Sequence, residues 1–175
     1  MGKEVQIIAG LFAVMEVDEY ALITVTQIAQ EAAIGRKTFY RYFKNKEEVL
    51  ERAVERLFLE YAAFEERYSA ANYETLVYHH FTFWQKHLAQ LKVLYKNDLM
   101  FYIFKQYQKR IPKLNNGYVR QEKLSPNIAE YAHAFTSGVF WSILYTWIES
   151  GAQETPQELA AICSTFLSSP VQIND

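Results

Sequence analysis

A segment near the start of the chain is rich in side chains that donate hydrogen bonds. Arg36, Lys37, Tyr40 and Arg41 fall on one predicted short helix, over residues 36–43. An arginine can pair with guanine through two hydrogen bonds, and a tyrosine hydroxyl can reach a phosphate oxygen. These residue types therefore indicate contact with base edges and phosphates in the major groove of DNA.

The charge around this segment supports the same interpretation, although the whole chain carries a net charge of −2. Residues 24–46 contain five basic side chains and one acidic side chain, Glu31, so the local net charge is +4. Salt screens charges more than ~10 Å away, so a DNA phosphate would respond mainly to this local field. Charge alone leaves a second interpretation open, in which these side chains form an ordinary solvated helix face.

Other residues that could carry chemistry form no recognisable site. His79, His80, His87 and His133 have no cysteine or carboxylate at metal-ligand spacing. The sequence contains no Ser/His/Asp order, paired-carboxylate motif or Gly-rich phosphate loop. The single cysteine, Cys163, lies among apolar residues, which favours packing over a redox role. We therefore expect no metal, no cofactor and no enzymatic activity.

The composition favours a compact helical protein. The 175 residues are 50% apolar, enough for one large or two small domains, and the six Gly and four Pro leave long stretches without either. A single cysteine cannot form an internal disulfide and suits a reducing compartment. The sequence has no signal-peptide pattern and no apolar run of roughly 18 residues, so we expect a cytoplasmic protein with no membrane partner.

Short elements with clear start signals must position the donor-rich residues. The apolar spacing predicts a first helix over about 3–17 and a second over 25–32, which Thr24 and Gln27 begin as a capping box. A tight turn at 33–35 then leads into the helix at 36–43. The residues expected to form a small core here are Val25, Ile28, Ala29, Ile34 and Phe39. These dimensions are typical of a helix-turn-helix.

The rest of the chain is also predicted to be helical, which makes the fold all-α. Asn45 caps a long fourth helix that reaches about residue 64 and could connect two bodies. Ser125 and Thr155 each precede a proline, a pattern typical of a helix start. The later helices are expected over about 73–91, 92–108, 126–150 and 156–167, with Gly151 ending the third of these.

The predicted helix at 126–150 is apolar nearly all round, so it must be covered on more than one side. A second copy of the chain is the expected cover, and a core helix wrapped by its own chain is the alternative. The expected dimer-interface residues are Phe135, Val139, Ile143, Trp147, Leu159, Ile162 and Phe166.

Aromatic residues gather in the second part of the chain, where they could line an effector pocket. Stacked rings with a few hydroxyls suit a flat or partly apolar ligand. The alternative is ordinary core packing. The candidate pocket residues are His80, Trp84, Tyr95, Tyr102, Phe104, Tyr107, Phe135 and Trp141.

Over about Ile7 to Leu50 the chain resembles the TetR family of transcriptional regulators. The resemblance rests on ITVTQIA at 23–29, TFYRYF at 38–43 and the Lys-Glu pair at 46–47. It implies a three-helix DNA-binding headpiece, joined by a long fourth helix to a helical domain that dimerises and often binds a small ligand. The DNA-contacting residues that it implies are Thr24, Thr26, Arg36, Lys37, Thr38, Tyr40, Arg41, Tyr42 and Lys46.

Individual roles follow from the same resemblance. Thr24 and Thr26 would lie near a phosphate, Lys37 and Tyr40 would face the groove, and Tyr42 and Lys46 would grip the DNA backbone. Two positions depart from the family pattern. Ala33 stands where the turn commonly has glycine, and Gly35 stands where a capping side chain is common. Neither change removes a hydrogen-bond donor, but an alanine with positive φ would cost ~1 kcal/mol.

The sequence therefore predicts a homodimeric, sequence-specific regulator that binds a pseudo-palindromic DNA operator. We expect a helix-turn-helix domain over residues 1–46 and an effector-binding and dimerisation domain over 47–175. The regulator is expected to be a repressor controlled by a small-molecule effector. The alternative is an adaptor of the same fold that acts mainly through a protein partner.

Overall fold

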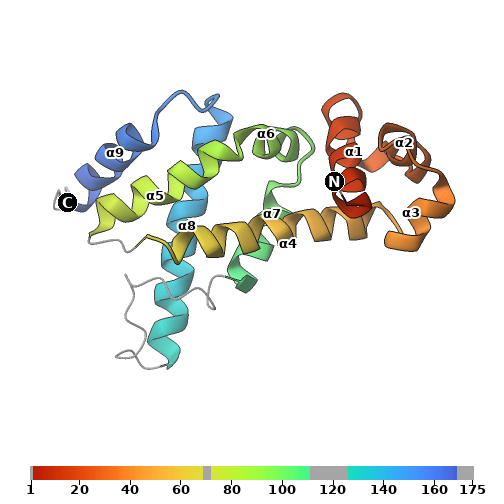
Figure 1. Ribbon diagram of the computed structural model, residues 1–175. Helices are drawn as coiled ribbons and strands as arrows, with labels where there is room; N and C mark the ends of the chain where they lie inside the picture. The colour runs from red at the N-terminus through yellow and green to blue at the C-terminus, as the bar shows by residue number, and fades with distance from the viewer. Residues whose placement is uncertain (1, 69–71, 111–125, 169–175) are drawn as a thin grey trace. The chain divides into compact units, whose positions relative to one another are not determined.

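The computed structural model describes residues 2–68, 72–110 and 126–168, and this part of the chain is helical with no strand (Figure 1). The predicted all-α fold is confirmed. In chain order the elements are α1 (Lys3–Val17), the 3-10 helix η1 (Tyr20–Leu22), α2 (Val25–Glu31), α3 (Arg36–Tyr42), α4 (Lys46–Glu65), α5 (Tyr73–Lys86), α6 (Leu88–Lys96), α7 (Met100–Arg110), α8 (Pro126–Glu149) and α9 (Pro156–Ser168).

The chain forms two compact units. The N-terminal unit contains residues up to 60 together with 89–103, and the C-terminal unit contains the described residues of 61–88 and 104–175. The domain boundary predicted from the sequence, between residues 46 and 47, falls inside the N-terminal unit at the start of α4.

The predicted helix starts are made by side-chain caps. At α2, the Thr24 hydroxyl accepts from the Gln27 backbone N–H at 3.3 Å, and Gln27 Oε1 accepts from the Thr24 N–H at 2.8 Å. Thr155 and Glu158 form the same reciprocal pair at α9. Asn45 Oδ1 accepts from the Glu48 N–H at 2.9 Å. These bonds satisfy backbone donors that have no partner within the helix. Ser125 lies outside the described residues.

The core of the N-terminal unit forms where α1 crosses α2. Ile7, Leu11 and Ile28 are completely buried. The crossing is close because Gly10 has no side chain: a Cβ atom at this position would lie 3.1 Å from the Cβ and backbone N of Ala32 and from the Ile28 carbonyl oxygen. Helix α1 therefore holds the backbone of α2 directly, which fixes the first helix of the predicted DNA-binding motif.

The turn between α2 and α3 carries the strain expected from the sequence. Ala33 has φ 47°, in the left-handed region that favours glycine. We expect Ala33→Gly to raise the free energy of unfolding of the N-terminal unit by up to ~1 kcal/mol, because the relieved strain exceeds the added freedom of the unfolded chain. Urea denaturation followed by circular dichroism measures this change, and a loss of stability would contradict it. Ala13→Gly, in the middle of α1, is the matched control and should instead lower stability by ~1 kcal/mol.

Two predicted helices were wrong. The helix expected over 73–91 ends at Lys86, and α6 begins at Leu88. The helix expected over 92–108 is divided between α6 and α7. The chain breaks at Asn97 and Asp98, and Asp98 has φ 56°. The Asn97 amide group explains the break, because it bonds to backbone groups of α1 and η1. Its Nδ2 donates to the Met15 carbonyl at 3.0 Å and its Oδ1 accepts from the Tyr20 N–H at 2.6 Å. Lys96 Nζ also donates to the carbonyl of Glu16.

The C-terminal unit is built around large aromatic side chains. Helix α5 packs along α9, and Phe81 of α5 meets Trp147 of α8 edge to face, with ring centroids 5.6 Å apart. Trp147 Nε1 donates to the Glu154 carbonyl at 3.0 Å. Helix α8 ends as predicted, because Gly151 has φ 95°. In the described part of the chain, no helix is long and apolar enough to cross a membrane.

Candidate functional site

Helix α3 presents the predicted DNA-binding side chains on the outside of the N-terminal unit. Phe39 is completely buried and anchors the helix, with Tyr40 edge-to-face against it at 5.6 Å between ring centroids. Tyr40 is 50% exposed, and Arg36, Lys37 and Arg41 are also exposed. Because one face of this short helix is fixed by the core, the opposite face projects four donor side chains into solvent.

Tyrosine rings support the two guanidinium groups of this face. Arg36 lies over the Tyr40 ring at 5.8 Å from its centroid, and Arg41 lies over the Tyr42 ring at 5.2 Å. Lys37 has no hydrogen-bond or ion-pair partner among the described residues. No carboxylate of the described residues neutralises these positive charges, which stay available to an anionic partner such as DNA.

The two threonines at the start of α2 differ in how their hydroxyls are used. The Thr24 hydroxyl belongs to the capping box, whereas Thr26 is exposed. Thr38, on α3, is half-buried, and Phe43 is buried. The predicted phosphate contact of Thr24 would thus have to share a hydroxyl that already accepts from the Gln27 backbone.

Lys46 is placed differently from what the sequence predicted. Its Nζ donates to three carbonyl oxygens, those of Tyr20 at 2.7 Å, Ala21 at 2.9 Å and Ile23 at 3.0 Å. It also lies 4.9 Å from the centroid of the Tyr20 ring. An ammonium group has three protons, so all of them are engaged. In this conformation Lys46 ties η1 and Ile23 to the start of α4, and its contact with the DNA backbone stays a prediction.

The predicted effector-pocket residues are only partly brought together. His80, Trp84 and Tyr107 are buried in one aromatic cluster of the C-terminal unit. Phe104 and Trp141 stack on each other, with centroids 5.1 Å apart. The remaining three predicted residues lie elsewhere: Tyr95 and Tyr102 belong to the N-terminal unit, and Phe135 is 72% exposed.

Sequence reasoning missed the residue at the centre of this cluster. Tyr61, on α4, stacks on Trp84 at 5.7 Å between centroids, and its hydroxyl lies 2.9 Å from His80 Nδ1. A hydrogen bond from Tyr61 also reaches the carboxyl group of Glu65, one helical turn further on. The available signal was a glutamate within the apolar face of a predicted helix, next to Leu57, Tyr61 and Phe64.

Burial sets the charge of these groups. It raises the pKa of Glu65 to about 7, although the hydrogen bond from Tyr61 acts in the opposite direction. Burial lowers the pKa of His80 to about 3, so this imidazole is neutral at physiological pH. The pKa of Tyr61 is raised by burial, so its hydroxyl stays protonated. The cluster therefore contains two neutral hydrogen-bonding groups and one carboxyl group that titrates near neutrality.

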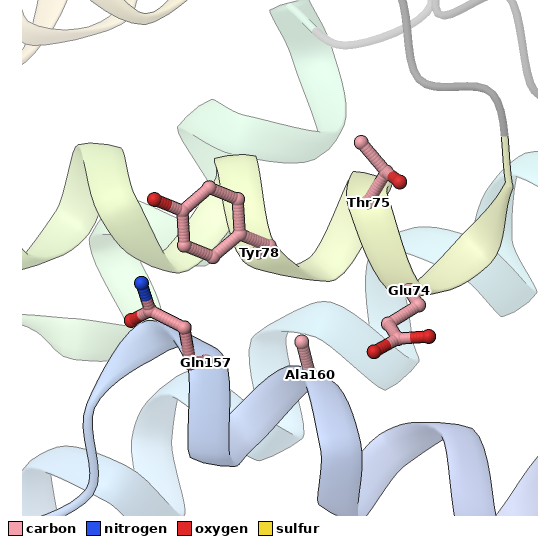
Figure 2. Close-up of a pocket in the computed structure, with 5 residues that line it drawn as sticks. All are labelled: Glu74, Thr75, Tyr78, Gln157 and Ala160. Atoms are coloured by element: carbon pink, nitrogen blue, oxygen red, sulfur yellow. The ribbon is translucent and has the colours of Figure 1, made fainter.

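A separate hollow lies between α5 and α9. It has a volume of about 300 Å³ and is lined by Glu74, Thr75, Tyr78, Gln157 and Ala160 (Figure 2). The sequence offered no signal for it, because the lining residues belong to polar faces of two helices that are far apart in the chain. Ala160 is buried, the other four lining residues are half-buried or exposed, and none of the five is among the described residues with a buried, unpartnered polar atom.

The predicted dimer residues divide into a buried and an exposed set. Trp147 and Leu159 are buried within the C-terminal unit, and Val139 and Ile143 are half-buried. Three residues are exposed at 72%, 44% and 75%, namely Phe135, Ile162 and Phe166. Further exposed apolar side chains that the sequence did not single out are Ile128, Tyr131 and Tyr145 on α8.

Cys163 is buried on α9, and burial raises the pKa of its thiol. A protonated, buried thiol is a poor nucleophile. Among the described residues, no three His, Cys, Asp or Glu side chains are grouped so that they could hold a metal ion.

Two family models match the chain. "Bacterial regulatory proteins, tetR family" matches residues 7–53, and "Transcriptional regulator C-terminal region" matches residues 71–169. Among solved structures, the dihydroxyacetone kinase operon activator DhaS has a TM-score of 0.64 at 19% identity, with 94% of this chain and 93% of that chain covered. The fatty acid degradation regulator FadR from Bacillus halodurans has a TM-score of 0.63 at 21% identity, with 98% and 97% covered. No curated protein sequence matches.

Proposed function

The chain belongs to the tetR family of bacterial regulatory proteins, which are DNA-binding transcriptional regulators, and we propose that it is a homodimeric repressor released by a small molecule. The observation that carries the proposal is helix α3. Its buried Phe39 fixes one face, and its opposite face carries exposed Arg36, Lys37, Tyr40 and Arg41 without carboxylate partners among the described residues. Each copy would insert this helix into the major groove of one half-site.

The dimer is supported by apolar side chains that the C-terminal unit leaves in solvent. Ile128, Tyr131 and Phe135 follow one another at spacings of three and four on α8, and Tyr131 and Phe135 are 77% and 72% exposed. Soluble monomers rarely expose such a contiguous apolar face. On α9, Ile162 and Phe166 are exposed one turn apart. We assign these faces to a second copy, which would make the operator a pseudo-palindrome.

Effector control is supported by the aromatic cluster around Tyr61. Ligand sites are typically lined by apolar and aromatic side chains with a few polar groups, and this cluster has that composition, with Tyr61, Glu65 and His80 as the polar groups. In the proposed dimer, one form has its two DNA-binding headpieces at the distance that fits the operator, and another form does not. The ligand would bind the second form more tightly, because only a difference in affinity can shift the equilibrium between the two forms.

A salt-titrated gel shift tests the DNA-binding part of the proposal. The purified protein is titrated on DNA from upstream of its own gene, with random DNA as competitor. We expect saturable binding of one dimer per site that weakens steeply with salt. Weak binding of equal strength to both DNAs would contradict the proposal, and binding that requires a second protein would favour the adaptor alternative.

Lys37→Ala should weaken binding to the operator by about 1–3 kcal/mol and relax the preference for its sequence, because Lys37 is exposed on the groove-facing side of α3. Lys46→Ala is the comparison, since both lysines belong to the same basic segment. The measured quantity is the slope of the logarithm of the binding constant against the logarithm of the salt concentration. If the Lys46 ammonium stays on the three carbonyls when DNA binds, its removal leaves this slope unchanged. If it moves to a phosphate, its removal lowers the slope by about one unit. Equal loss on every sequence for Lys37→Ala would exclude base contact.

A further inference from the structure

Among the residues that the structure describes, no cation is paired with the carboxyl group of Glu65. Its Oε1 atom is buried and has no hydrogen-bond partner among the described residues. The ion pairs of Arg52 with Glu4 and Glu55 do not include Glu65. Glu65 is partly buried, and a carboxylate removed from water without a cation is costly, so such a group either takes up a proton or pairs with a positive charge.

His80 contributes a second unpartnered atom to the same cluster. The residue is 2% exposed, and its Nε2 atom is buried with no partner among the described residues. Its Nδ1 lies 2.9 Å from the Tyr61 hydroxyl. Glu65 and His80 thus contact the same hydroxyl from different helices, α4 and α5, and both have one polar atom left over.

The direction of the hydrogen bonds decides what these atoms can bind. Tyr61 has one hydroxyl proton and is hydrogen-bonded to both Glu65 and Tyr107. When Glu65 is ionised, its carboxylate can only accept, so the Tyr61 hydroxyl donates to it. In the tautomer that fits this arrangement, His80 Nδ1 donates to the Tyr61 oxygen, and Nε2 of the neutral imidazole keeps a lone pair. Both unpartnered atoms are therefore acceptors, and their partner must be a donor.

The walls of the cluster favour the same kind of partner. Tyr61 is surrounded by the rings of Phe83, Trp84 and Tyr107, with centroids 5.0, 5.7 and 6.2 Å away. Phe140 lies 4.5 Å from the His80 ring. Aromatic faces carry negative electrostatic potential and attract cations, and their apolar surface suits a carbon skeleton rather than a hydrated metal ion.

We propose that the C-terminal unit binds an organic cation, an ammonium or amidinium group on an aromatic or apolar body, with Glu65 as its counter-ion and His80 Nε2 as a second acceptor. The ligand supplies the missing positive charge and donates to both atoms. This inference rests on the proposed effector control and specifies the chemistry of the effector.

Isothermal titration calorimetry on the full chain without DNA tests this assignment. The probes are phenethylamine and tryptamine, each paired with the carboxylate of similar shape, 3-phenylpropionate and indole-3-propionate. We expect the amines to bind and the carboxylates not to bind. No binding of either amine at millimolar concentration, or equal binding of amines and carboxylates, would overturn the proposal. Because no DNA is present, the outcome is independent of the gel shift that tests the regulator.

Variants and pH identify the residue responsible. Glu65→Gln should weaken amine binding at least tenfold, whereas Glu66→Gln, the exposed neighbour, should leave it unchanged. In the unaltered protein the affinity should rise about tenfold from pH 6 to pH 8, because the cation competes with a proton on a carboxyl group whose pKa is about 7. A flat pH profile, or equal binding by Glu65→Gln, would overturn the role of Glu65.

Discussion

Truncation of Phe39 to alanine should unfold the N-terminal unit and abolish DNA binding in the same step. The side chain is completely buried and contacts Tyr40 and Phe43, with the Phe43 ring centroid 6.1 Å away. Removing a buried phenylalanine costs about 3–5 kcal/mol, which is a large part of the stability of a small domain. Urea denaturation followed by circular dichroism should show this loss as an early transition.

Tyr40→Ala provides the matched control on the adjacent residue. Tyr40 is half-exposed, so its truncation should change stability by less than about 1 kcal/mol while it weakens binding to the operator. The two variants therefore separate the anchoring side of α3 from its recognition side. A Phe39→Ala protein that keeps its stability would show that α3 is held by something other than this ring.

The second large effect is expected at Phe135. If α8 forms the dimer interface, Phe135→Asp places a charge where the partner would bury an aromatic ring, and the dissociation constant should rise at least a hundredfold, or about 3 kcal/mol. Sedimentation velocity should then show a monomer at micromolar concentration. Operator affinity should fall with it, because a monomer occupies one half-site only.

Leu59→Asp is the control for this substitution. Leu59 is 64% exposed on α4, so the same change of chemistry occurs on a comparable helix surface outside the proposed interface. This variant should remain dimeric. If both variants remain dimeric, the exposed face of α8 is not the interface, and if both dissociate, the effect is not specific to α8.

The helix-turn-helix was predictable because its signals are local. The capping pair of Thr24 and Gln27 and the buried Phe39 follow from residue type and short spacing. The positive φ of Ala33 follows from the family resemblance, in which this turn commonly has glycine. The break between α6 and α7 was missed for the opposite reason. Asn97 and Asp98 are turn-forming residues, but the hydrogen bonds that decide the break come from Met15 and Tyr20, about 80 positions away.

The faces of α8 were not predictable because the helix is apolar nearly all round. Trp147 and Leu159 were expected at a dimer interface, yet Trp147 is enclosed by Phe81 and by the turn that contains Glu154. Which apolar residues face inward depends on how neighbouring helices pack, and periodicity cannot supply that information when polar positions are few. The same limitation hid Tyr61 and Glu65, whose importance appears only when α5 places His80 beside them.

The hydrogen bonds of Asn97 and Lys96 limit how the DNA-binding unit of this protein can be exchanged with that of a related regulator. Residues 89–103 belong to the N-terminal unit, where they bind the last carbonyls of α1 and the first N–H of η1. The N-terminal unit, which carries the helix-turn-helix, is therefore discontinuous in sequence. The bonds from Lys96 and Asn97 that hold α1 and η1 come from a segment after α5. A chimera that exchanges only the first 46 or 60 residues would transfer α3 without the Lys96 and Asn97 side chains that bond to α1 and η1. We therefore expect a working chimera to include residues 89–103, which contain Lys96 and Asn97, from the same protein as the N-terminal helices.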